Sequence, residues 1–177
     1  PILSQALVMF KESGYEDVVP WTLDCLARVA LGTGETEEAL SLCKEGLEMA
    51  REHDDAHVEA HLLMTLGSAF AAQGMFEVAV THLLKALTMT WSSGDTRLVL
   101  WTLLGFAELR IKQRDLNQVD KWLALVEQDL LTEVWIKEKA RRLRQSLTIS
   151  ENANEATQPS NMNRTAELHR VVTELLA

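Results

Sequence analysis

Three histidines stand four residues apart in the sequence, at His53, His57 and His61, and histidine is the commonest metal ligand in proteins. In the run His57-Val58-Glu59-Ala60-His61, the two imidazoles would share one face of a helix, a spacing that can hold a metal ion. The run departs from the His-Glu-x-x-His zinc motif, no third ligand is identifiable, and the two aspartates after His53 should interrupt a helix. We therefore predict surface or rim histidines and no metal, with a two-histidine metal site as the alternative.

Residue arrangements that support catalysis are not found elsewhere in the sequence. There is no glycine-rich phosphate loop and no Gly-x-Ser-x-Gly motif, and neither Cys25 nor Cys43 is paired by spacing with a histidine. Both cysteines stand within apolar helical patterns, which predicts reduced, buried thiols and a reducing compartment. The sequence thus predicts a cytoplasmic protein that is not an enzyme and uses no cofactor.

The charge of the chain argues against nucleic acid and membrane partners. Seventeen Lys and Arg against 26 Asp and Glu give a net charge of −9, which repels a phosphate backbone, and no apolar run reaches the roughly 20 residues of a membrane span. Residues 132–148 are the exception, with five basic and two acidic residues. Because Trp135 is the only aromatic residue there, we expect a solvated face of a terminal helix rather than a nucleic-acid site; the basic residues are Lys137, Lys139, Arg141, Arg142 and Arg144.

The elements that must position these residues follow from an internal repeat of 40 residues. The segment that begins at Leu26-Ala27 aligns without gaps with the segments that begin at Leu66-Gly67 and Phe106-Ala107. In each unit, apolar residues recur twice at helical spacing, with turn residues between the two runs. Together with few Gly, Pro and aromatic residues, this pattern predicts an all-α fold in which each unit is a pair of antiparallel helices.

The repeat divides the chain into a helical-repeat domain over residues 1–148, a polar flexible linker at 149–163 and a C-terminal amphipathic helix at 164–177. Three alternatives stay open for this last helix: docking on its own last repeat, mimicry of a bound peptide, or dimerisation. Within the domain we expect a half repeat at 1–14, repeats at 15–54, 55–94 and 95–131, and a capping helix at 132–148.

The small and large residues of the repeat resemble the tetratricopeptide repeat family. The second unit has that family's signature spacing at Leu66-Gly67, Phe70, Ala79, Leu83 and Ala86, and the first at Leu26-Ala27, Ala30, Ala39, Cys43 and Gly46. The resemblance implies an α-α superhelix, a solenoid of antiparallel helix pairs. A 40-residue unit is similar to the long repeats in the tails of bacterial signal-transduction ATPases and transcription regulators.

In such solenoids the first helices of successive repeats line a concave binding surface. The resemblance places ten residues there: Trp21, Asp24, Arg28, His61, Met64, Ser68, Trp101, Leu104, Glu108 and Lys112. Tryptophan and methionine would anchor an amphipathic or extended peptide, while the cations would bind its polar ends. The alternative for Trp21 and Trp101 is a place in the core between helices.

These observations predict a non-catalytic repeat domain that binds a protein or peptide, as the sensor or scaffold part of a larger bacterial protein in signal transduction or transcription regulation. Two alternatives stay open. One is a sensor domain for a small-molecule inducer, and the other is a structural or oligomerising segment that pairs with copies of itself.

Overall fold

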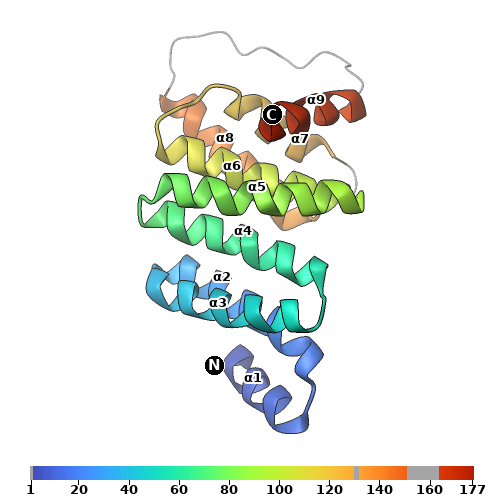
Figure 1. Ribbon diagram of the computed structural model, residues 1–177. Helices are drawn as coiled ribbons and strands as arrows, with labels where there is room; N and C mark the ends of the chain where they lie inside the picture. Colours follow the sequence, from blue (N-terminus) through green and yellow to red (C-terminus); the bar gives the residue numbers. More distant parts are fainter. Residues whose placement is uncertain (1, 130–131, 151–163) are drawn as a thin grey trace. The chain divides into compact units, whose positions relative to one another are not determined.

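The computed structural model describes residues 2–129, 132–150 and 164–177, and all regular secondary structure in these ranges is helical (Figure 1). The predicted all-α fold of packed, tetratricopeptide-like helix pairs is confirmed. The greater part of the predicted linker, residues 151–163, lies outside the described residues. The chain forms two compact units, Pro1–Ser92 and Ser93–Ala177, and each is described separately.

The first unit consists of helices joined by short turns: α1 (Ile2–Ser13), the 3₁₀ helix η1 (Glu16–Val18), α2 (Val19–Thr33), α3 (Thr36–Glu52), α4 (Ala56–Ala72) and α5 (Phe76–Ser93). Helix α2 packs against α1, α3 and α4, and α3 also packs against α4, so each helix contacts mainly its neighbours in the sequence. The largest fully buried side chains of this unit come from α2, α4 and α5 and include Leu23, Leu62, Leu63 and Leu83.

The turns between helices follow a regular spacing. A residue with positive φ occurs every 20 residues, at Gly14, Gly34, Asp54, Gly74, Gly94 and Arg114. Glycine adopts this left-handed conformation without a steric cost, and it is the usual residue directly after a helix. Arg114 stands where the first two repeats have glycine, and with φ 60° it adopts the same conformation.

Two aspartates that follow these turns begin the next helices. The Asp55 carboxylate accepts a hydrogen bond from the backbone N–H of Val58, at 3.0 Å, and Asp95 accepts from the N–H groups of Arg97 and Leu98. A carboxylate at this position satisfies donors that the first helical turn leaves unpaired. The aspartates therefore explain why α4 begins at Ala56 and why the next helix, α6 (Thr96–Lys112), begins at Thr96. They also explain why the helix is interrupted between His53 and His57.

The second unit comprises α6 (Thr96–Lys112), α7 (Val119–Gln128), α8 (Val134–Ser150) and α9 (Arg164–Leu176). Helix α7 packs against α6, α8 and α9, and α6 also packs against α8. Helix α7 has 10 residues, against 17 in α3 and 18 in α5. Of the alternatives for the C-terminal helix, docking on the last repeat is the arrangement that the structure shows.

Two glycines in the first unit stand where helices approach each other closely. A Cβ at Gly67 in α4 would lie 2.7 Å from Cγ of Leu83 in α5, and a Cβ at Gly46 would lie 2.9 Å from Cδ2 of Leu62. Leu83 is fully buried, so it has little room to move. Any side chain larger than hydrogen at position 67 would therefore displace Leu83 of α5.

We predict opposite effects for two glycine-to-alanine substitutions. Gly67→Ala should lower the free energy of unfolding by about 1–2 kcal/mol, because overpacking outweighs the better helix propensity of alanine. Gly32 also lies in a helix, but nothing lies within 4 Å of its Cβ position, so Gly32→Ala should raise that energy by about 0.5–1 kcal/mol. Urea unfolding of both variants checks this; a Gly67→Ala variant as stable as Gly32→Ala would contradict it.

Candidate ligand-binding surface

An aromatic cluster joins α2 and α4, the first helices of two successive repeats. The Trp21 ring meets His61 edge-on, with ring centroids 4.7 Å apart, and stacks with His57 at 6.3 Å. The two histidine rings lie 4.8 Å from each other. Trp21 is 40% exposed and His57 is exposed, while His61 is buried. The cluster therefore leaves one tryptophan and one histidine accessible, and the buried histidine contacts both of them.

One turn further along α2, Asp24 is fully buried. The Thr65 hydroxyl of α4 donates a hydrogen bond of 2.6 Å to its Oδ1, and Nη1 of Arg28 lies 3.6 Å from its Oδ2, as an ion pair too long for a hydrogen bond. Desolvation raises the pKa of Asp24, and the hydrogen bond from Thr65 and the charge of Arg28 offset only part of that increase. Asp24 thus links α2 to α4 and is not accessible at the surface, which corrects its assignment to the open surface.

The other predicted residues of this unit lie on the same two helices. Arg28 and Ser68 are half-buried, so both keep some accessible surface. Met64 is buried, which corrects its assignment to the open surface. The physical reason is the packing of α4, whose buried residues run without a break from Ala60 to Gly67.

In the second unit, too, some of the predicted residues keep accessible surface and others are buried. Trp101 is half-buried and meets Trp135 of α8 edge-on at 5.0 Å, and Glu108 forms a 2.6 Å ion pair with Lys139. Lys112 is exposed, but Leu104 is fully buried, which corrects its assignment to the open surface. It belongs to a run of buried residues in α6, from Thr102 to Leu104.

Sequence reasoning did not assign to the binding surface four of the residues that take part in these contacts, namely His57, Thr65, Trp135 and Lys139. Trp135 and Lys139 stand on the helix after the third repeat, where α7 is short, so a 40-residue shift does not point to them. Thr65 could have been found, because it stands 41 residues after Asp24 and a buried aspartate requires a donor.

The basic stretch of α8 is largely occupied by acidic partners within the second unit. Four of its five cations form ion pairs: Lys139 with Glu108, Arg141 and Arg142 with Glu138, and Arg144 with Asp120 and Glu127. Asp120 and Glu127 belong to α7 and Glu108 to α6. The charge run thus contributes to the contacts between these helices, which argues against a phosphate-binding role.

Metal ligation has no further support in the part of the chain that the structure describes. No group of three or more His, Cys, Asp or Glu side chains there could hold a metal ion. Both cysteines are free thiols, and burial raises the pKa of each, with the charge of Asp24 adding to the effect. A raised pKa keeps a thiol protonated at neutral pH and lowers its reactivity.

We predict a pH-dependent difference in stability between the native chain and Asp24→Asn. A carboxyl whose pKa is raised on folding stabilises the fold fully below its unfolded pKa of about 3.9, and that stability is lost as the pH rises through the folded pKa. The free energy of unfolding of Asp24→Asn minus that of the native chain should therefore increase from pH 4 upward. Urea unfolding at several pH values measures it; a decrease over this range would contradict the burial argument.

The surface formed by α2 and α4 lies within a segment that matches the model of a known repeat family. Residues 18–90 match a family model described as "Tetratricopeptide repeat", and this range includes α2, α3, α4 and nearly all of α5. The curated proteins gave no match. None of the helices in the described ranges has the length and hydropathy of a membrane span. The matched residues thus support a tetratricopeptide repeat domain, and repeats of this family generally mediate protein–protein interaction.

Proposed function

We propose that this chain is a non-catalytic binding domain, and that the surface formed by α2 and α4 binds a peptide segment of a partner protein. The observation that carries the proposal is the exposed part of the Trp21–His57–His61 cluster. Tryptophan has a large side chain with only two rotatable bonds, so it provides a large contact area while losing little conformational entropy when it binds. It is also enriched among the residues that dominate binding energy.

The cluster is fixed before any ligand arrives. His61 is buried beneath Trp21, and the Asp24–Thr65 hydrogen bond holds the next turn of α2 against α4. A side chain that is already ordered loses less entropy when it binds. This preorganisation supports a role for Trp21 as an anchor that enters an apolar part of the partner.

The charged residues on α2 and α4 suggest which sign of charge the peptide carries. The one acidic residue of α2, Asp24, is buried, and that of α4, Glu59, is engaged by Arg51 and Lys85 at 2.9 and 2.8 Å. Arg28 and His57 keep accessible surface on these helices. In a chain of net charge −9, a surface poor in exposed acid favours a peptide with an acidic group beside its apolar residue.

The second unit contributes a second proposed anchor, Trp101, which packs against the 40% exposed Trp135. The wider setting is also part of the proposal: the sensor or scaffold part of a cytoplasmic bacterial regulatory protein, in signal transduction or transcription regulation. The 40-residue repeat and the free thiols support that setting.

We predict that Trp21→Ala weakens peptide binding without unfolding the chain. Peptides selected from a random displayed library against the full chain should lose about 10- to 100-fold in affinity, because truncation of an anchor costs 2 kcal/mol or more. Fluorescence polarisation with labelled peptides measures the affinity, and thermal unfolding checks the fold.

Tyr15→Ala is the matched control, since Tyr15 is an exposed aromatic residue of the same unit that packs on Phe10 of α1. It should leave the affinity unchanged. Equal losses in both variants, or a loss explained by a much lower Tm of Trp21→Ala, would contradict the assignment. So would a library from which no peptide is enriched.

A further inference from the structure

Exposed apolar side chains are concentrated at the N-terminal end of the first unit. Of the eleven large apolar side chains that are exposed in the described ranges, seven belong to residues 2–29. None of the residues of α1 is buried. Single exposed apolar residues are normal on a protein surface, but a concentration of them marks a site of interaction. The seven residues are Ile2, Leu3, Val8, Met9, Tyr15, Trp21 and Val29.

The repeat identifies the side of α2 that is open. On the side of α4 that packs against α2, the Thr65 hydroxyl donates to Asp24 and Ala69 follows one turn later; Thr65 and Ala69 are both buried. Forty residues earlier, Cys25 and Val29 stand at the same two positions of α2. There Cys25 is half-buried and Val29 is 53% exposed. The side of α2 that corresponds to the contact side of α4 is therefore largely uncovered.

Helix α1 differs from α3 in the same way. Helix α3 packs against both α2 and α4, whereas α1 packs mainly against α2. Cys43 of α3 is fully buried, but Leu3, at the same position of α1, is exposed. Met49 is half-buried, but its counterpart Met9 is 64% exposed. These residues of α1 thus keep accessible the surface that their counterparts in α3 bury.

The two open sides form one surface. In the first repeat a single helix, α2, packs against both α3 and α4. Because α1 and α2 correspond to α3 and α4 in the 40-residue register, one helix in the equivalent position would cover both of their open sides. We call this the N-terminal surface, made up of Leu3, Met9, Cys25 and Val29.

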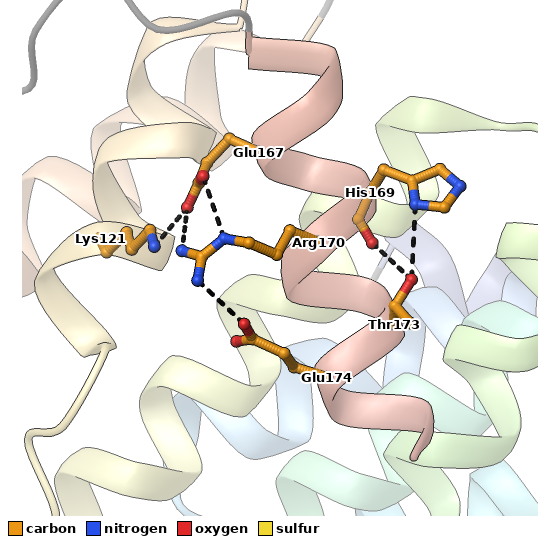
Figure 2. Close-up of polar contacts among 6 residues, drawn as sticks. All are labelled: Lys121, Glu167, His169, Arg170, Thr173 and Glu174. Carbon is orange, nitrogen blue, oxygen red and sulfur yellow. Dashed lines mark hydrogen bonds and ion pairs between the residues drawn. The ribbon is translucent and has the colours of Figure 1, made fainter.

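The second unit shows which kind of element covers the last repeat in this protein. Helix α9 packs against the side of α7 that carries Lys121, the outer side of this helix. Glu167 of α9 is buried and forms an ion pair with Lys121 (Figure 2). An apolar stripe on one face of α9 is buried beside Glu167, at Leu168, Val171 and Val172. The covering element is thus an amphipathic helix with a charge opposite to that of the residue it meets.

The charges beside the N-terminal surface are acidic. Lys11 is the only basic residue before Arg28, and its ammonium group lies 2.7 Å from a carboxylate oxygen of Glu45. Complementary charge favours a partner with basic residues beside its apolar stripe. A second copy that presented the same surface would bring like charges together. Three exposed acids lie where the chain passes from α1 to α2, namely Glu12, Glu16 and Asp17.

We propose that the N-terminal surface is a docking site for one amphipathic helix of a partner protein, and that basic residues flank the apolar stripe of this helix. Docking of this kind uses apolar residues spaced three or four apart as anchors. The inference goes beyond the peptide site proposed on α2 and α4, because neither α1 nor Val29 takes part in the Trp21–His57–His61 cluster.

A displayed library of helical peptides tests the proposal. Every member has a stripe of leucine and alanine at three- and four-residue spacing, and Lys, Glu or Gln at each position that flanks the stripe. Selection against the full native chain should enrich Lys at the flanking positions. Fluorescence polarisation then measures the affinity of the most enriched peptide, which should fall as salt screens the charges.

Two variants of the full chain locate the bound helix. Val29→Asp and Met9→Asp each place a charge in the N-terminal surface, at positions that are exposed in the native chain. Each should weaken binding about tenfold or more, because the docked helix would bury an unpaired charge. Thr81→Asp is the matched control, since it adds the same charge to an exposed residue of α5, and it should bind as the native chain does. Circular dichroism verifies the fold, and the corresponding serine variant replaces either aspartate variant that fails to fold.

A charge reversal tests the role of the acidic residues. The double variant Glu16→Lys, Asp17→Lys keeps the apolar residues of the N-terminal surface. It should lower the affinity for the Lys-flanked peptide and raise the affinity for a Glu-flanked peptide with the same stripe. His57→Ala changes the cluster proposed for peptide binding and should leave the affinity for the helix unchanged, so the two proposals can fail separately.

Three results would overturn the proposal. One is a selection that enriches no helical peptide, or that enriches peptides without regard to their flanking charge. Another is native affinity in Val29→Asp or Met9→Asp when the variant is folded. The third comes from analytical ultracentrifugation, in which the native chain should be a monomer. A dimer that Val29→Asp dissociates would instead make a second copy the occupant of the N-terminal surface.

Discussion

The close approach of neighbouring helices at glycine is the constraint on which the first unit depends. Gly67 lies under Leu83 with no room for a Cβ, and Gly46 lies under Leu62 and Leu23. Interiors are packed closely enough that one added methyl group must displace something. Because each helix contacts mainly its neighbours, such a displacement would shift the next helix. The position of α4 against α2, and with it the aromatic cluster, therefore depends on these two contacts.

Buried carboxylates mark two of the places where helices from different parts of the chain meet. Asp24 links α2 to α4 through Thr65, and Glu167 links α9 to α7 through Lys121. Burial of a charge costs free energy, so such pairs are not the main source of stability. What each contributes is selectivity, because a helix in the wrong register would leave the acid without its partner. The two acids have different surroundings: Asp24 receives one hydroxyl bond and a distant guanidinium, while Glu167 is paired with two cations.

The shortened third repeat explains the organisation of the second unit. Helix α7 ends after 10 residues, and α8 follows where a further repeat would begin. The basic residues of α8 pair with acids on α6 and α7, so a stretch that stands out in the sequence serves the packing of a terminal helix. The outer side of α7 remains for α9 to cover. A terminal repeat has no following neighbour, and here the helix that covers it comes from further along the same chain.

The sequence by itself determined the helices and their turns. Helical periodicity, the glycines and the capping aspartates act within a few residues of each other, so a pattern in one segment is sufficient to identify them. It also placed Trp21 and His61 in one register, because the repeat does so. Only the tertiary structure decided which side of each helix stays open: Trp21 keeps accessible surface, whereas Asp24, Met64 and Leu104 are buried. Only the tertiary structure also decided which residues contact each other across helices, as in the pairs Asp24–Thr65, Trp101–Trp135 and Lys121–Glu167. Exposure and pairing depend on what packs against a residue from elsewhere in the chain, and no local pattern encodes that.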